Sequence, residues 1–407
     1  MKNYKMLMVI FSVVFLLGLG CKSKPDIKAE AGDIREIYAG VANVYILRED
    51  NSLWGTGYKY QTELTRISDD AGNPFSGVKT VAAGERHTVI LREDGTLWGA
   101  GDSANGELGL WTARVDAFTQ LKADNNPVIG VKNAAAGNNS TFFIDSEGSL
   151  WASGYNYYGE LGPGNRNVQL SFSKIESAGR NIKSIAAGIR HTVLLKEDGT
   201  LWAAGYNFNG QLGLGDTEDR FNFTEVKDAG SDIIAIGAGS YHTVILKSDG
   251  SVWTAGSNYW GQLGFAGKND RLTFTRVSDE NSGSLTGVKE IAARGNITVL
   301  LKADGALLLT GNYTDTEGRI DLSPDAIQPP TEEKSPAGND EKSSFISLGI
   351  EQGEGIKFGG VKKIILGYNS IYVISSDGYL WAAGSNRYGQ LSLSLDTEIL
   401  QTLKIIN

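Results

Sequence analysis

A segment of roughly 50 residues recurs along this chain, and no other feature limits its fold as strongly. Two of its copies read VKTVAAGERHTVILREDGTLWGAGDSANGELG and IKSIAAGIRHTVLLKEDGTLWAAGYNFNGQLG. Similar segments begin at Ile34, Val78, Val131, Ile182, Ile233, Val288 and Val361. Such repetition is typical of architectures in which each unit buries its faces against its two neighbours.

Each repeat predicts four antiparallel strands. The VxxIAAG and HTVIL segments carry the aliphatic and β-branched residues that suit buried strands. An Asp-Gly pair, as at Asp94 and Gly95, then predicts a tight hairpin. The Leu-Trp segment predicts a third strand, and an FTxV segment, as at 223–226, predicts a fourth. Four antiparallel strands per repeat are typical of propeller blades, so we expect an all-β, seven-bladed β-propeller.

The chain ends suggest how the ring closes. No FTxV-like segment precedes Ile34, whereas residues 400–406 read LQTLKII. We expect this last strand to pair with the N-terminal blade begun by residues 34–57, because such pairing removes two exposed strand edges.

The combination of AAGxxHT, DGxLW and GxNxxGQLG resembles the repeat of the regulator-of-chromosome-condensation family over residues 34–407. Repeat six departs from this pattern, with Leu308 in place of Trp and a polar insertion at about 323–345 that we expect to loop out. Eukaryotic relatives exchange nucleotides on a small GTPase, and an exported bacterial relative caps β-lactamase with an aromatic face. The exchange role does not fit a protein outside the cytoplasm, so the resemblance implies protein binding without naming the target.

The N-terminus resembles a bacterial lipoprotein signal. In residues 1–20, Lys2 and Lys5 precede an apolar run that is short for a membrane span, and Cys21 follows at once. We expect Cys21 to be acylated and residues 21–33 to form a flexible tether, so that the protein is exported and anchored to a membrane lipid bilayer, facing the periplasm or the cell exterior. A plain signal peptide or a single membrane anchor are the alternatives.

Charge and cysteine content exclude some classes of protein. The formal net charge is −9 with no Lys/Arg cluster, which argues against a nucleic-acid partner. Cys21 is the single cysteine, so the chain can form no internal disulfide.

Residues that could carry chemistry all fall into repeat positions. His87, His191 and His242 share one position, where other repeats have Ser140 or Ser370, so we expect them to pack or hydrogen-bond as part of the blade structure rather than bind a metal. Six tryptophans share another position and are expected in the core: Trp54, Trp98, Trp151, Trp202, Trp253 and Trp381. We find no catalytic triad or phosphate-binding loop, and therefore predict neither an enzyme nor a cofactor.

The turn after each first strand and the loop after each third strand are expected at one end of the ring. These loops are rich in Tyr, Trp and Arg, which dominate interface hot spots. Tyr155 and Tyr206 could belong to this face or to the blades.

A protein partner is the favoured interpretation of this face. Carbohydrate or small-ligand binding, rings that merely cover the blade ends, and a divergent enzyme in the channel remain alternatives. The candidate residues are Tyr60, Arg86, Trp111, Tyr157, Tyr158, Arg190, Phe208, Tyr241, Tyr259, Trp260, Tyr368, Arg387 and Tyr388.

Overall fold

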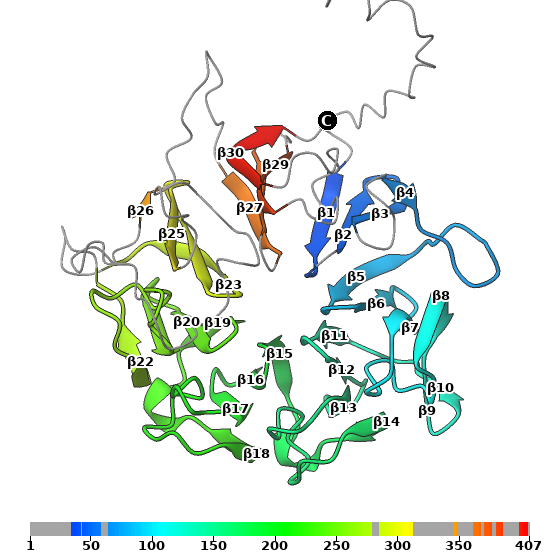
Figure 1. Ribbon diagram of the computed structural model, residues 1–407, viewed down its shortest axis with the longest axis horizontal. Helices are drawn as coiled ribbons and strands as arrows, with labels where there is room; N and C mark the ends of the chain where they lie inside the picture. The colour runs from blue at the N-terminus through cyan, green and yellow to red at the C-terminus, as the bar shows by residue number, and fades with distance from the viewer. Residues whose placement is uncertain are drawn as a thin grey trace, which may run out of the picture. The chain divides into compact units, whose positions relative to one another are not determined.

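Successive strands pair into four-stranded antiparallel sheets that stand around a ring (Figure 1). The computed structural model describes residues 34–41, 43–57, 64–278, 285–311, 346–347, 361–367, 370–376, 380–385 and 399–405. All of these residues lie in the unit Ala31–Ile406. The predicted signal, Cys21, the tether and the insertion at 323–345 lie outside the described residues.

Each sheet uses consecutive strands in simple order. The sheets are β1 (Ile34–Ala39), β2 (Asn43–Arg48), β3 (Leu53–Gly57), β4 (Thr65–Arg66); β5 (Val78–Ala83), β6 (His87–Arg92), β7 (Leu97–Asp102), β8 (Arg114–Gln120); β11 (Asn133–Ala136), β12 (Ser140–Ile144), β13 (Leu150–Gly154), β14 (Gln169–Lys174); β15 (Ile182–Ala187), β16 (His191–Lys196), β17 (Leu201–Gly205), β18 (Arg220–Glu225); β19 (Ile233–Ala238), β20 (His242–Lys247), β21 (Val252–Gly256), β22 (Arg271–Arg276); β23 (Val288–Arg294), β24 (Ile297–Lys302), β25 (Leu307–Gly311), β26 (Ile346–Ser347); and β27 (Val361–Leu366), β28 (Ser370–Ser375), β29 (Leu380–Ser385), β30 (Ile399–Ile405).

Elements outside the blades are small. Strands β9 (Lys122–Ala123) and β10 (Asn126–Pro127) form a separate two-stranded ribbon. The helices in the described part of the chain are the 3-10 turns η2 (Glu176–Ala178) and η3 (Lys227–Ala229). None of the described helices is long and apolar enough to span a membrane.

The first strand of each blade lies innermost and contacts the first strands of both neighbouring blades. Apolar clusters fill the space between neighbouring blades rather than the inside of one blade. Leu195 of β16 and Ile245 of β20 belong to one such cluster, and Phe142 of β12 and Leu194 of β16 to another. This sharing explains why the second strands are buried along almost their whole length. The faces of a blade are covered by its two neighbours.

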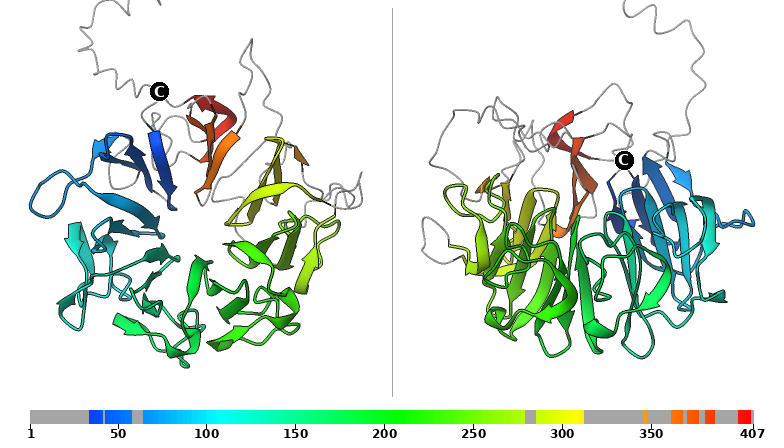
Figure 2. Two further views of the ribbon diagram at one scale, coloured as in Figure 1. Left: turned by 180° about the vertical axis from the view of Figure 1, so that it is seen from behind. Right: turned by 60° about the horizontal axis from the view of Figure 1, so that its bottom comes forward.

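The predicted fold class is wrong in its ring closure. Strand β30 pairs with β29, with Ile405 opposite Trp381 and Leu400 opposite Gly384, and so completes its own blade instead of joining the N-terminal one. Figures 1 and 2 show the blue β1–β4 blade beside the orange and red β27–β30 blade. Pairing with a strand close in sequence costs less loop-closure entropy than pairing across the whole chain, which favours the observed arrangement.

Face-to-face packing closes the ring instead of strand pairing. Ile37 and Val44 share an apolar cluster with Tyr372 and Ile374. Lys363 Nζ also lies 2.5 Å from Glu36 Oε1 across the junction between the last and first blades. The predicted four antiparallel strands are found in each of these sheets, although the outer strands β4 and β26 have only two residues each.

The tryptophan column lies at the edge of the core, which corrects the predicted core position. The five indoles in the described residues are half-buried. The indole N–H of Trp253 donates to Ser251 Oγ at 3.0 Å, and Lys247 Nζ lies 4.7 Å from the centre of the Trp253 ring. Trp253 also packs against a buried apolar cluster. Each such ring therefore covers the rim of the core and keeps its polar edge near the surface.

The histidine column links consecutive blades, which confirms the expected hydrogen-bonding role. His191 Nε2 lies 3.0 Å from Thr243 Oγ1 of the next blade. His87 Nε2 has the same relation to Thr141 at 3.0 Å, and His242 to Thr298 at 2.9 Å.

Candidate functional site

In four successive blades of the described chain, a backbone hydrogen bond joins the two loops of the repeat at one end of the ring. In one blade, Tyr206 N–H donates to the carbonyl of Arg190 at 2.8 Å. In the preceding blade, Tyr155 N–H donates to the carbonyl of Asn139 at 2.9 Å. In these blades, the residue at or just after the end of the third strand is thereby bonded to the turn after the first strand. This confirms that both loops share one end of the blade.

A buried asparagine gives the longer loop its shape. Asn156 Nδ2 donates to the carbonyls of Asn165 and Asn167, while its Oδ1 accepts the N–H of Leu161 at 3.0 Å. Asn207 and Asn258 repeat this pattern in the next two blades. The asparagine amide forms hydrogen bonds with the loop's backbone groups from the inner side. These bonds hold the loop backbone in place, and the residues that follow the asparagine point outward.

Six rings from three neighbouring blades form a continuous surface, which we call the aromatic ladder: Tyr155, Tyr157, Tyr158, Tyr206, Phe208 and Tyr241. Ring centroids of Tyr157 and Tyr158 are 5.3 Å apart, and those of Tyr158 and Tyr206 are 5.0 Å apart. Tyr206 continues to Phe208 at 6.3 Å and to Tyr241 at 6.2 Å. Tyr157 is 55% exposed and Phe208 is 68% exposed. Large apolar rings that remain this exposed mark interaction surfaces.

Charged groups lie within the aromatic ladder. The guanidinium carbon of Arg190 is 4.7 Å from the Tyr158 ring centre and 5.9 Å from that of Tyr206. Beneath them, Glu160 Oε2 accepts the N–H of Tyr158 at 2.9 Å. Burial raises the pKa of Glu160 to about 7, although Arg190 acts in the opposite direction. The ladder thus combines a half-exposed cation with a carboxyl group that is partly protonated near neutral pH.

Sequence reasoning left Tyr155 and Tyr206 undecided, and the structure places both in the ladder. Each directly follows the glycine that ends a third strand, at Gly154 and Gly205. The residue after this glycine is the first of the loop that carries the other ladder rings, so its position in the repeat could have predicted that Tyr155 and Tyr206 belong to the ladder.

Other predicted residues lie apart from the ladder. Tyr259 and Trp260 form their own pair at 5.0 Å. Trp111 is 81% exposed. Arg86 forms an ion pair with Asp102 at 3.9 Å. Among the described residues, no ring contact joins these groups to the ladder. The remaining predicted residues, Tyr60, Tyr368, Arg387 and Tyr388, lie outside the described part of the chain.

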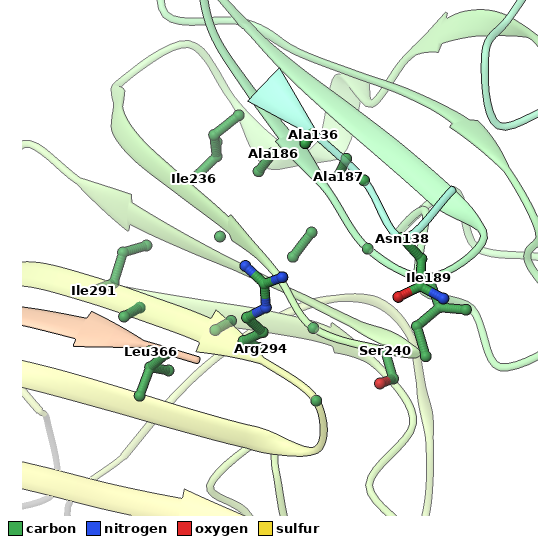
Figure 3. Close-up of a pocket in the computed structure, with 18 residues that line it drawn as sticks. Ala136, Asn138, Ala186, Ala187, Ile189, Ile236, Ser240, Ile291, Arg294 and Leu366 are labelled. Carbon is green, nitrogen blue, oxygen red and sulfur yellow. The ribbon is translucent and has the colours of Figure 1, made fainter. Parts of the chain in front are cut away.

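A pocket of about 270 Å³ lies where the C-terminal ends of several first strands meet (Figure 3). Its lining is mostly small or aliphatic, as at Ala186, Ile236 and Ile291. Figure 3 shows Arg294 reaching into it, and the guanidinium donates to the carbonyls of Ala39 and Ala83, each at 3.1 Å. In the described part of the chain, no group of three or more His, Cys, Asp or Glu side chains could hold a metal ion.

This arrangement defines a class of protein: a β-propeller with an aromatic loop face. A family model described as the Regulator of chromosome condensation (RCC1) repeat matches residues 78–107, 182–211 and 233–262, and a second model of the same description matches 147–195 and 198–246. The segments 78–107 and 147–262 of this chain therefore match the regulator of chromosome condensation (RCC1) repeat.

Relatives share part of their length with this chain. It is 33% identical over 175 residues to the ultraviolet-B receptor UVR8 of Arabidopsis thaliana, over 42% of this chain and 40% of the receptor. It is 28% identical over 252 residues to the secretion-regulating guanine nucleotide exchange factor of Bos taurus, over 61% of this chain and 51% of that protein. The matches therefore span about half or less of these relatives.

Solved structures show the same fold. Yeast RCC1 (Prp20), solved bound to Kap60, has a TM-score of 0.67 at 18% identity, covering 92% of this chain and 85% of that one. Human WBSCR16 has a TM-score of 0.68 at 16% identity, covering 84% of both chains. At these identities the likeness establishes the fold alone.

Proposed function

We propose that this chain is a protein-binding module that presents the aromatic ladder to its partner, with Trp111 and the Tyr259–Trp260 pair as outlying contacts. The observation that carries this proposal is the ladder itself. Its rings contact one another across three blades, and those of the first two blades lie on loops held by the buried Asn156 and Asn207. Rings fixed before binding lose little conformational entropy when a partner covers them, which favours affinity.

The names of two similar proteins favour a binding role. One is named a guanine nucleotide exchange factor, and the yeast relative Prp20p is described with binding properties to Gsp1p and histones. Proteins of this repeat family act on partners through protein contacts, and a binding role needs no catalytic group in the pocket. We propose no exchange activity for this chain, because an N-terminus that resembles a signal would remove it from the compartment of a small GTPase.

We further propose that the chain is exported and held on a bacterial membrane through acylated Cys21. The support is the signal-like stretch at residues 1–20 followed directly by cysteine. A Cys21→Ser variant should be released from the membrane fraction into the soluble fraction, and metabolic labelling with a fatty acid should fail on it. Retention and labelling equal to the parent chain would contradict the anchor.

The binding proposal is tested by affinity capture from the native envelope with the full-length chain. The Tyr157→Ala/Phe208→Ala variant should lose the captured protein, since both rings are exposed. Its melting temperature should stay within a few degrees, as expected for surface substitutions. Ile129→Ala is the matched control, because Ile129 is 67% exposed and precedes β11, at the opposite end of its blade. Equal capture by both variants would contradict the ladder as the binding surface.

Carbohydrate binding is the second candidate, favoured by the exposed tyrosines, since aromatic rings also stack on sugars. Soluble glycans that bind the parent chain and not the ladder variant would support it over a protein partner.

A further inference from the structure

Two arginines occupy the same repeat position and have different surroundings. Arg86 and Arg190 each stand directly before the repeat histidine. Arg86 lies 3.9 Å from Asp102, whereas Arg190 lies over two tyrosine rings. Among the described residues, no carboxylate lies within ion-pair distance of Arg190.

One residue of the repeat explains this difference. Asp102 directly follows Gly101 at the end of the third strand, and Tyr206 directly follows Gly205 at the same position of its own repeat. Both residues donate a backbone hydrogen bond to their arginine's carbonyl, Asp102 at 3.0 Å and Tyr206 at 2.8 Å. The position that supplies a counterion to Arg86 therefore supplies an aromatic ring to Arg190.

The nearby carboxyl groups are already engaged. Glu160 is buried, accepts the N–H of Tyr158, and has a pKa raised to about 7 by that burial. Asp219 accepts the N–H of Asn207 at 2.9 Å and lies 3.7 Å from Arg166. Neither contacts the Arg190 guanidinium, so a cation remains at the centre of the ladder.

We propose that Arg190 receives a carboxylate from the partner, an Asp or Glu side chain flanked by an apolar residue that covers Tyr157 or Phe208. A guanidinium that lies over aromatic rings can still donate two parallel N–H bonds to a carboxylate. The exposed rings on either side then exclude water from that ion pair. This inference rests on the proposed protein-binding function and adds the chemistry of the contact.

The test uses displayed peptides of about 12 residues, a length that can cover such a surface. Peptides are selected on the purified full-length chain, and each enriched peptide is compared with a version in which its acidic residue becomes the amide. Affinities are measured on the parent chain, Arg190→Gln and the matched control Arg86→Gln. Circular dichroism and the melting temperature establish that each variant is folded.

Enriched peptides should share an acidic residue beside an apolar one. Replacing the peptide's acidic residue by its amide should weaken binding to the parent chain and to Arg86→Gln about tenfold, because the lost contact is a charge-assisted hydrogen bond. The same replacement should weaken binding to Arg190→Gln less than about twofold, because that variant has no guanidinium to lose the contact.

Two results would overturn the inference and leave the proposed function standing. The first is the enrichment of peptides whose binding requires Tyr157 and Phe208 but which contain no acidic residue. The second is an equal loss of affinity, on the parent chain and on Arg190→Gln, when the acidic residue of a peptide becomes the amide. Enrichment only of peptides that ignore the ladder, or no enrichment, would contradict both proposals. Binding of acidic oligosaccharides that depends on Arg190, with no acidic peptides enriched, would assign the site to sugars instead.

Discussion

Glu160 shows how one residue changes a repeat position from structural to titratable. Gln211 and Gln262 occupy this position in the next two blades, where each side-chain oxygen accepts a loop N–H, from Asn209 and Trp260 respectively. Glu160 makes the same bond to Tyr158 with a group that can ionise. Because burial raises its pKa to about 7, the folded chain holds this proton at pH values where the unfolded chain releases it.

We expect Glu160→Gln to stabilise the protein more at pH 8 than at pH 5. The unfolded carboxyl titrates near its ordinary value and the folded one near 7, so the parent chain loses stability as pH rises between these values. The gain in unfolding free energy should be about 2 kcal/mol larger at pH 8 than at pH 5. Urea unfolding at both pH values measures it. A difference that does not change with pH would contradict the assignment.

At the scale of the element, the repeats are coupled by contacts between one blade's loop and the next blade's fourth strand. Gly213 ends the GQLG loop with φ +72, and a Cβ there would lie 2.4 Å from Phe274 of β22. Gly162 has the same relation to Phe223 of β18. The glycine of one repeat and the phenylalanine of the next therefore require each other.

Gly213→Ala should lower the unfolding free energy by about 3 kcal/mol, the sum of a left-handed backbone and a collision with Phe274. Gly267→Ala is the matched control, because Gly267 has φ +78 and a Cβ there would have no atom of the described residues within 4 Å. It should cost about 1 kcal/mol through backbone strain alone. Equal losses, measured by denaturant unfolding, would show that the phenylalanine contact adds nothing.

The histidines couple the blades through their second strands and make stability depend on pH. Burial lowers the pKa of His87 and of His191 to about 4 and that of His242 to about 3. Unfolded histidines bind protons below about 6.5, while the folded ones stay neutral until near pH 4. The unfolded state therefore binds more protons in this window, and stability falls as pH falls through it.

His191→Ser, which copies Ser140 at the same repeat position, should be less stable at pH 7 because it loses the bond to Thr243. Between pH 6 and pH 4.5, its stability should fall less steeply than that of the parent chain, by up to about 1.4 kcal/mol per pH unit. Thermal unfolding across this range measures both slopes. Parallel slopes would contradict a neutral buried histidine.

At the scale of the whole molecule, groups from distant parts of the chain meet across the centre of the ring. Arg294 stands where other repeats have the glycine of AAG, such as Gly84. Its guanidinium donates to the carbonyls of Ala39 and Ala83, at the ends of β1 and β5. It therefore connects β23 to two other blades across the central pocket.

Arg294→Ala should lower the unfolding free energy by about 2 kcal/mol, since two charged hydrogen bonds to buried carbonyls are lost. Arg180→Ala removes a surface ion pair with Glu147 and should cost less than about 1 kcal/mol. Hydrogen exchange of the β1 amides should also accelerate in Arg294→Ala alone. Equal losses and unchanged exchange would mean that Arg294 does not support the ring.

The sequence by itself determined the local features of this protein. The spacing of aliphatic residues, Asp-Gly turns and loop glycines predicted strands such as β6 and β16 and the shared end of the two loops, because these depend on neighbours within one repeat. The histidine column followed from the same periodicity.

Only the tertiary structure decided the features that depend on two repeats or on the whole ring. Strand β30 pairs with β29, which is close to it in the sequence, and not with the edge of the N-terminal blade, which is distant in the sequence. The half-burial of Trp253 depends on the neighbouring blade that covers one of its faces. The isolation of the Arg190 charge depends on rings brought from Tyr158 and Tyr206, because the packing of two neighbouring blades decides which of their loop side chains come together.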